Sequence, residues 1–215
     1  MDAIQLGLLE QVADLHGVPE GAYNIRSNGQ GIARNSTANI EIAPKQDKPG
    51  IDIIIKPGTK KESVHIPVVL SQSGLKDMVY NDFYVGEDAD VVIVAGCGIH
   101  NDGGADSQHD GIHRFFLGKN ARVKYIEKHY GEGTGTGERI LNPVTEVTLD
   151  EGSYMEMETV QIKGVNSTIR TTRGKLAADA KLIIHEKIMT DGAQTAETDF
   201  EVDLDGENSS ADVVS

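Results

Sequence analysis

Cysteine, tryptophan and basic residues are scarce in this chain. It has one cysteine, Cys97, and no tryptophan, and its 20 Lys and Arg stand against 34 Asp and Glu, for a formal net charge of −14. A lone cysteine cannot form an internal disulfide, which favours a reducing, cytoplasmic location. Nucleic acid and anionic membrane surfaces are excluded as expected partners, because both would repel this charge in the absence of a basic patch.

Long apolar runs are also missing. The longest, such as VVIVAG at residues 91–96, have the length of a strand and are too short to cross a bilayer as a helix. The N-terminus, MDAIQLGLLEQV, has neither the basic start nor the cleavage site of a signal peptide. What the chain does have is glycine, 24 of its 215 residues, which suits many short strands and turns better than a helical bundle.

The first 50 residues differ from the rest. Residues 2–16 predict one helix that begins at Asp2 as N-cap and ends at Gly17 and Pro19; its apolar face comprises Ile4, Leu8, Leu9, Val12 and Leu15. Residues 17–50 are rich in Gly, Asn, Ser and Pro and predict a loop-rich lead-in with a short strand near 39–43. We therefore expect an N-terminal part over 1–50 and a β domain over 51–215.

Beyond residue 51, one strand–bend–strand unit recurs. Its copies begin at VGEDADVVIVAG, LGKNARVKYIEK, LDEGSYMEMETV and LAADAKLIIHEK, and their first residues are Val85, Leu117, Leu149 and Leu176, with Leu204 a looser fifth. The spacings are 32, 32, 27 and 28 residues. A unit this small cannot bury its apolar side alone, whereas stacking on its neighbours buries that side and pairs its edges. The repeat predicts a mainly β fold, a parallel β-helix or β-solenoid with these residues in one interior column; a β-sandwich is the alternative.

The segment CGIHNDGGADSQHDGIH, residues 97–113, concentrates the candidate chemistry. It contains Cys97, His100, His109 and His113. Nitrogen and sulfur ligands of this kind suit zinc or iron, so a metal-dependent enzyme that uses the three histidines is one hypothesis. A nearby imidazole can also lower the pKa of a thiol and favour the thiolate. The plainer interpretations are a small core cysteine and a partly buried strand histidine.

Two further features refine this segment. The chain leaves the β-helix after Cys97 and returns before His109, so we expect the two side chains to approach on adjacent strands, with His100 farther away in the glycine-rich loop. The later segment GEGTGTGE, residues 131–138, lacks the Lys-Ser/Thr of a phosphate loop and is interpreted as a flexible crossover.

The stretch VGEDADVVIVAGCGIH…HDGIHRFFLGKNARVKY resembles the SufB/SufD family of iron–sulfur cluster assembly proteins. The resemblance rests on Gly96-Cys97, on His109, and on Ala121, Val123 and Tyr125, and it extends over residues 75–215. It implies a right-handed parallel β-helix that acts as a scaffold on which iron–sulfur clusters are built transiently, without being a turnover enzyme. It further implies that Cys97 accepts or relays sulfur, with His109 as the neighbouring base or ligand. His100 and His113 are weaker ligand candidates, which the spacing of the segment 97–113 suggests.

The resemblance also implies partners: a SufC-type ATPase and a second SufB/SufD-like subunit, or a second copy of this chain. The sequence departs from the family pattern after Tyr125, where it reads IEKHYG, and after Cys97, where it reads GIH. Family members continue beyond the position of Ser215, so we expect a β-helix domain that is truncated at its C-terminal end. A purely structural β-helix subunit is the third hypothesis.

Overall fold

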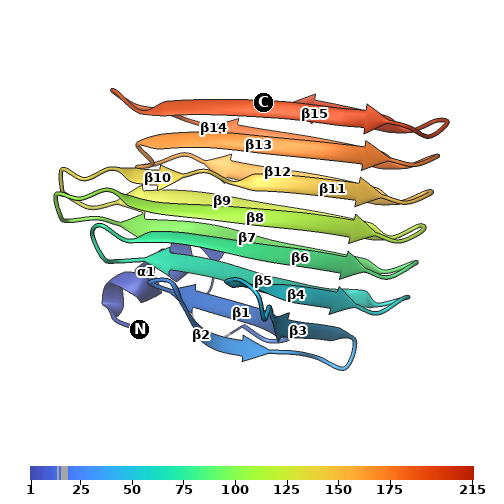
Figure 1. Cartoon of the computed structure of the whole chain (residues 1–215), viewed down its shortest axis with the longest axis horizontal. Coiled ribbons are helices and arrows are strands. Elements are labelled where there is room, and N and C mark those ends of the chain that lie inside the picture. The colour runs from blue at the N-terminus through green and yellow to red at the C-terminus, as the bar shows by residue number, and fades with distance from the viewer. Residues whose placement is uncertain (14, 16–18) are drawn as a thin grey trace.

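Parallel strands dominate the structure, a computed structural model that describes residues 1–13, 15 and 19–215 (Figure 1). The helix α1 spans Ala3–Ala13. The strands are β1 (Ala22–Ser27), β2 (Gln30–Asn35), β3 (Ile40–Pro44), β4 (Gly50–Ile55), β5 (Lys60–Leu70), β6 (Lys76–Val85), β7 (Asp90–His100), β8 (Ser107–Leu117), β9 (Arg122–Glu132), β10 (Arg139–Leu141), β11 (Val144–Leu149), β12 (Tyr154–Gln161), β13 (Ser167–Leu176), β14 (Lys181–Ile188), β15 (Thr195–Leu204) and β16 (Ser210–Val214).

From β4 onward, successive strands alternate between two sheets, except that β10 and β11 both lie in sheet B. Sheet A has the order β16-β14-β12-β9-β7-β5-β1-β2. Sheet B contains β13, β11, β8, β6, β4 and β3, with β15 paired to β13 and the short β10 paired to β8 and β13. The pairs along both stacks are parallel, except at the N-terminal end, where β2 pairs antiparallel with β1 and β3 with β4. Each coil therefore contributes to both sheets, so the predicted parallel β-helix is confirmed and the β-sandwich is wrong.

The predicted interior column is present in sheet B. Val85, Leu117, Leu149, Leu176 and Leu204 are consecutive register partners. The first four are at most 3% exposed, and Leu204, in the last strand of that sheet, is 52% exposed. Asp88 follows Val85 by three residues, and Asn120 follows Leu117 by three residues. Their φ angles are 56° and 57°. Aspartate and asparagine tolerate this left-handed conformation, which turns the chain tightly from one sheet to the other.

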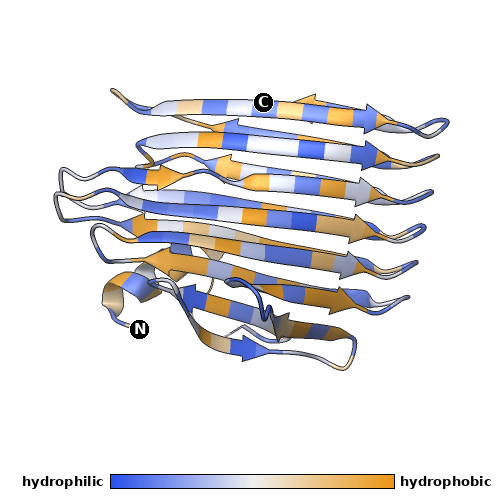
Figure 2. Cartoon of the chain, in the orientation of Figure 1, coloured by the Kyte–Doolittle hydropathy of each residue, from blue (hydrophilic) through white to orange (hydrophobic). Residues whose placement is uncertain are grey.

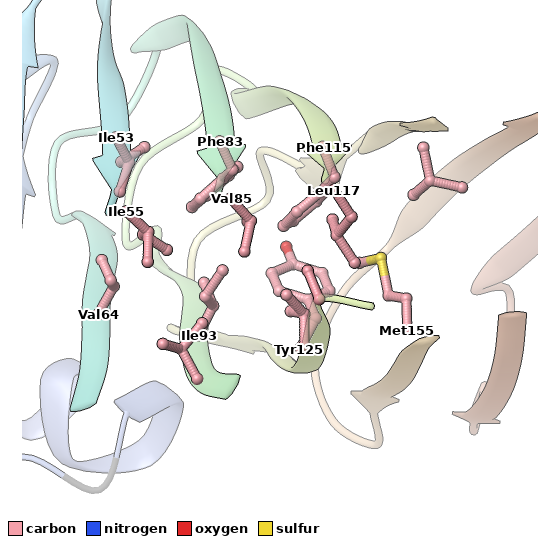
Figure 3. Packing of buried hydrophobic residues seen from close by; sticks show 14 of the residues in the cluster. Ile53, Ile55, Val64, Phe83, Val85, Ile93, Phe115, Leu117, Tyr125 and Met155 are labelled. Carbon is pink, nitrogen blue, oxygen red and sulfur yellow. The ribbon is translucent and has the colours of Figure 1, made fainter. Parts of the chain in front are cut away.

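The interior near these bends is apolar. Residues of the two sheets point toward one another there (Figure 3). Phe83 and Phe115 stack with ring centroids 4.3 Å apart, and Tyr125 meets Phe115 edge-on at 5.0 Å. Each fully buried side chain of this size stabilises the fold by about 1.5–3 kcal/mol relative to exposure. Hydrophobic and hydrophilic residues alternate along the strands (Figure 2), which follows from the opposite directions of successive strand side chains.

The helix α1 covers the outer face of sheet A, where it packs against β5, β7 and β9. Asp2 caps it as predicted: its carboxylate accepts the Gln5 backbone N–H at 2.9 Å, and the Gln5 side chain accepts the Asp2 N–H at 3.2 Å. Leu8, Leu9 and Val12 are buried as predicted, whereas Ile4 is 41% exposed. The predicted end of this helix at Gly17 lies outside the described residues.

Two expectations about connections need correction. The predicted lead-in over residues 17–50 contains β1, β2 and β3, and β1 and β3 both join the sheets, because β1 pairs with β5 and β3 with β4. The segment 131–138 is a stacked connection and not a flexible crossover. The N–H of Gly135 donates to Asn101 O at 3.1 Å, and that of Gly137 donates to Gly103 O at 3.0 Å.

The outer surface is polar in most places. Asp82 binds Arg114 and Lys45 on the outside of sheet B, and Tyr84 and Phe116 stack beside them at 5.3 Å. Among the described residues, none of the helical segments is long and apolar enough to cross a membrane.

Candidate functional site

Cys97 lies near the end of β7 with its side chain inside the β-helix. Alternation along this strand directs Ala95, Cys97 and Ile99 inward, and Gly96 and Gly98 toward the helix that covers the strand. Cys97 is 3% exposed and packs in an apolar cluster with Val68, Leu70, Ile99, Leu141 and Val165. The buried thiol therefore borders apolar side chains.

A cavity of about 20 Å³ adjoins the thiol. Its polar lining consists of Cys97, His109, His113, Glu127 and His129. This volume suffices for about one water molecule. The sequence-predicted residues Cys97, His109 and His113 thus meet at one place, whereas His100 does not line the cavity.

The route by which Cys97 and His109 meet differs from the expected one. The sequence predicted adjacent strands of one sheet, but β7 belongs to sheet A and β8, which carries His109, belongs to sheet B. The two side chains approach across the interior. His100 instead lies at the end of β7, where Nε2 is 2.8 Å from Asp102 Oδ2 and Nδ1 is 3.1 Å from Glu132 Oε1.

The repeat period identifies several site residues that inspection of one segment missed. His129 is the register partner of Cys97 in sheet A, and it lies 32 residues later in the sequence. Asp77 and His109 are partners at the same spacing in sheet B. The 32-residue distance between Val85 and Leu117 was the available signal, because in these coils adding it to an inward-facing position gives that position's neighbour in the next coil.

His109 is held by a buried carboxylate. Its Nδ1 lies 3.2 Å from Asp77 Oδ2, and both side chains are 6% exposed. Burial by itself raises the pKa of Asp77, but the hydrogen bond and charge of His109 and the charge of Arg26 outweigh burial and hold that pKa below its ordinary value. Asp77 is therefore an ionised acceptor beside the imidazole.

A directed chain of hydrogen bonds fixes His113. Its Nδ1 lies 2.7 Å from the Tyr125 hydroxyl, which itself donates to Glu127 Oε1 at 2.9 Å. Asn81 Nδ2 lies 3.3 Å from His113 Nε2. Burial lowers the pKa of His113 to about 4, so the imidazole is neutral near pH 7. Because Tyr125 donates to Glu127, the His113 Nδ1–H donates to the Tyr125 oxygen, and Nε2 accepts from Asn81.

A buried ion-pair network adjoins the hydrogen bonds of His113, Tyr125 and Glu127. Arg170 binds Glu127 through Nη1, and its Nε lies 3.0 Å from Glu186 Oε1. Burial raises the pKa of Glu127, but Arg170 and then His129 outweigh it, so this pKa lies well below its usual range. His129 Nδ1 is 3.3 Å from both Arg170 Nη2 and Gln161 Oε1. Glu127 is therefore ionised inside the β-helix and is compensated by a cation.

These surroundings change the expectation for the thiol. Burial, and then the negative charges of Asp77, Glu127 and Asp110, raise the pKa of Cys97 well above its ordinary value of 9.0. The prediction that neighbouring imidazoles activate it by lowering its pKa is wrong in direction, because desolvation and carboxylates dominate. The resting group is a neutral thiol. Thiolate chemistry at this position requires a base to remove the proton.

The residues do not form a metal centre as they stand. Among the described residues, no group of three or more His, Cys, Asp and Glu side chains has an arrangement that could hold a metal ion. His109 and His113 both face the space beside Gly111, and the third member of the proposed triad, His100, has carboxylate partners elsewhere.

The C-terminal half of the chain resembles a known protein family. Residues 113–215 match the family model described as "SUF system FeS cluster assembly, SufBD core domain". A curated relative from Archaeoglobus fulgidus, named "Iron-sulfur cluster assembly SufBD family protein", is 26% identical over 177 residues. These matches confirm the resemblance to the SufB/SufD family.

The matches to the SufB/SufD family each cover only part of the chain or of the relative. The alignment with the archaeal relative covers 81% of this chain and 46% of the relative, so the chain spans about half the length of that protein. The family-model match begins at His113 and therefore includes Tyr125, Glu127, His129 and Arg170, while Cys97 and His109 precede it. The roles of Cys97 and His109 consequently depend on their geometry in this chain.

Proposed function

We propose that this chain is a scaffold component of iron–sulfur cluster assembly in which Cys97 accepts or relays sulfur and His109 is the neighbouring base. The observation that carries the proposal is the shared cavity of Cys97 and His109 inside a β-helix whose residues 113–215 match the SufBD core domain. The resemblance to the SufB/SufD family supports the scaffold role, as distinct from that of a turnover enzyme.

The geometry supports a balanced sulfur-transfer step. The Cys97 thiol gives its proton to Nε2 of His109, and the thiolate attacks the outer sulfur of an organic or protein persulfide, R–S–SH. The donor's S–S bond breaks as the new S–S bond forms on Cys97. The departing R–S⁻ then takes the proton from His109. The products are R–SH and a Cys97 persulfide, and no external oxidant or reductant is consumed.

The cavity volume favours sulfur relay over cluster binding at Cys97. About 20 Å³ accommodates a particle of roughly the size of one water molecule. One transferred sulfur atom is of that order, whereas a cluster of several iron and sulfur atoms is much larger. The iron–sulfur cluster is therefore cargo that is completed elsewhere in the assembly, in our proposal with a SufC-type ATPase and a second SufB/SufD-like subunit or copy of this chain.

Sulfur loading tests this function directly. The full chain is incubated with a low-molecular-weight persulfide, and a gain of one sulfur atom on the peptide that contains Cys97 is followed by mass spectrometry. We expect loading of the natural chain, none in Cys97→Ala, and loading slowed by at least about 100-fold in His109→Ala, the scale of general base catalysis. His185→Ala, at an exposed position on β14, is the control. Equal loading of His109→Ala and the natural chain would reject the base role.

A metal assay separates the rival hypothesis. A stoichiometric, tightly bound zinc or iron ion in the purified chain that is lost from His100→Ala would favour the metal-dependent enzyme. A chain that neither loads sulfur nor binds metal, yet forms the complex with its partners, would leave only the structural role.

A further inference from the structure

The imidazole of His109 differs from the other two that line the cavity. Both nitrogens of His113 are engaged, with Tyr125 and Asn81. In His129, Nδ1 lies near Arg170 and Gln161, and Nε2 lies 3.7 Å from the Glu127 carboxylate. In His109, Nδ1 has Asp77 as its partner, and Nε2 makes no hydrogen bond within the part of the chain that the structure describes. His109 is thus the imidazole with a nitrogen available to the cavity.

Asp77 determines which nitrogen this is. An ionised carboxylate can only accept hydrogen bonds, so the proton of neutral His109 must lie on Nδ1. The lone pair then lies on Nε2. A carboxylate behind a histidine fixes the tautomer and orientation of the ring in the same way in hydrolytic triads.

Asp77 is itself held from the opposite side. Arg26 on β1 lies with Nη2 at 3.0 Å from Asp77 Oδ1, while Oδ2 faces His109. The same Nη2 donates to Gly29 O at 2.9 Å, which fixes the guanidinium. Because Arg26 is only partly exposed and Asp77 is buried, the carboxylate has a fixed orientation and a compensated charge.

The strand that carries His109 leaves room at Nε2. Gly111 is two residues along β8 and faces the same cavity. A Cβ at this position would lie 3.5 Å from His109 Nε2 and 3.1 Å from His113 Nε2. A larger side chain would therefore occupy the space that Nε2 faces.

We propose that Asp77 is a positioning residue that, held by Arg26, keeps His109 in the tautomer with a free Nε2 beside Cys97. The inference rests on the proposed function for its chemical purpose, since a thiol whose resting form is neutral needs a base. The positioning itself can be measured without any sulfur donor.

Nuclear magnetic resonance of the full chain, labelled with ¹⁵N, reads the tautomer. Long-range ¹H–¹⁵N correlations distinguish a protonated from an unprotonated ring nitrogen, and His109→Gln assigns the signals. At a pH where His109 is neutral, we expect Nδ1 protonated and Nε2 unprotonated in the natural chain. A proton on Nε2 overturns the proposal, and this measurement needs no Asp77 variant.

Asp77→Asn then tests the cause, with Asp82→Asn as its control. Asp82 lies on the same strand, is 2% exposed and is ion-paired to Lys45 and Arg114, but it faces the outside of sheet B. We expect Asp77→Asn to populate the Nε2–H tautomer and Asp82→Asn to leave the His109 signals unchanged. An unchanged tautomer in a folded Asp77→Asn chain overturns the proposal.

Sulfur loading distinguishes this inference from the proposed function. Loading of Cys97 should fall by at least about tenfold in Asp77→Asn and remain unchanged in Asp82→Asn. A changed tautomer with unchanged loading confirms the positioning by Asp77 and rejects His109 as the base. An unchanged tautomer with slowed loading rejects the positioning and leaves the proposed function intact.

Discussion

Cys97 on β7 and His129 on β9 are direct register partners in sheet A, and both side chains line the cavity inside the β-helix. They lie 32 residues apart in the sequence, one coil of the repeat. His109 reaches the same cavity from the facing sheet. The thiol is thus enclosed by imidazoles from two directions, while burial and nearby carboxylates keep it protonated.

Cys97 should react slowly with small alkylating reagents in the folded chain. It is 3% exposed and its pKa is raised by burial, so both access and the thiolate population are low. We expect iodoacetamide near neutral pH to modify it at least about tenfold more slowly than a free cysteine, with the difference abolished by urea. Rapid labelling of the native chain would show that the cavity is open to solvent.

Leu149 should be essential for stability, because it lies in the middle of the interior column at 1% exposure. Leu149→Ala should lower the free energy of unfolding by about 2–5 kcal/mol. Leu149→Asp should be worse, since an unpaired charge would be buried in apolar surroundings. The exposed neighbour Thr148 supplies the control Thr148→Asp, which should change stability by less than about 0.5 kcal/mol. Urea denaturation measures all three, and a mild effect of Leu149→Asp would contradict the column.

Gly96 should be required for docking of α1. A Cβ at this position would lie 2.5 Å from Val12 O and 2.8 Å from Val12 Cβ, so Gly96→Ala forces the helix away at a cost of about 1–3 kcal/mol. Hydrogen exchange of the α1 amides should accelerate accordingly. The matched variant is Gly7→Ala on the helix itself, which meets nothing within 4 Å and should stabilise the helix by up to about 1 kcal/mol. Equal exchange in both variants would contradict this interface.

His100 should make the loops that follow β7 and β9 sensitive to pH. Burial lowers its pKa, but hydrogen bonds to Asp102 and Glu132 outweigh burial and raise it above 6.5. A raised folded-state pKa gives stability that is complete below the unfolded value and is lost as pH rises through the folded value.

The Thr134 backbone amide donates to Asp102 Oδ1 at 2.7 Å. Its hydrogen exchange therefore reports the opening of these loops. After correction for intrinsic exchange, its protection in the natural chain should be complete below the ordinary histidine pKa of 6.5 and should fall as pH rises through the raised pKa of His100. In His100→Gln the protection should be lower at acidic pH and independent of pH. A pH-independent protection in the natural chain would contradict the prediction.

The sequence by itself determined the β-helix. Alternation along each strand fixes which side chains point inward, and the 32-residue spacing of Val85, Leu117 and Leu149 fixes which of them stack in one sheet. Both rules are local, because they depend only on the strand repeat of two residues and on the length of a coil. The partnership of Cys97 with His129 was readable from this period in the same way.

Only the tertiary structure decided how the two sheets face each other. The approach of His109 to Cys97 across the interior, and the pairing of Arg170 with Glu127, depend on the bends that set one sheet against the other. The residue pattern of a single strand does not determine how far apart the side chains of two facing sheets lie. The direction of the Cys97 pKa shift likewise followed from burial and from carboxylates of other coils, since desolvation and charge act through space and not along the chain.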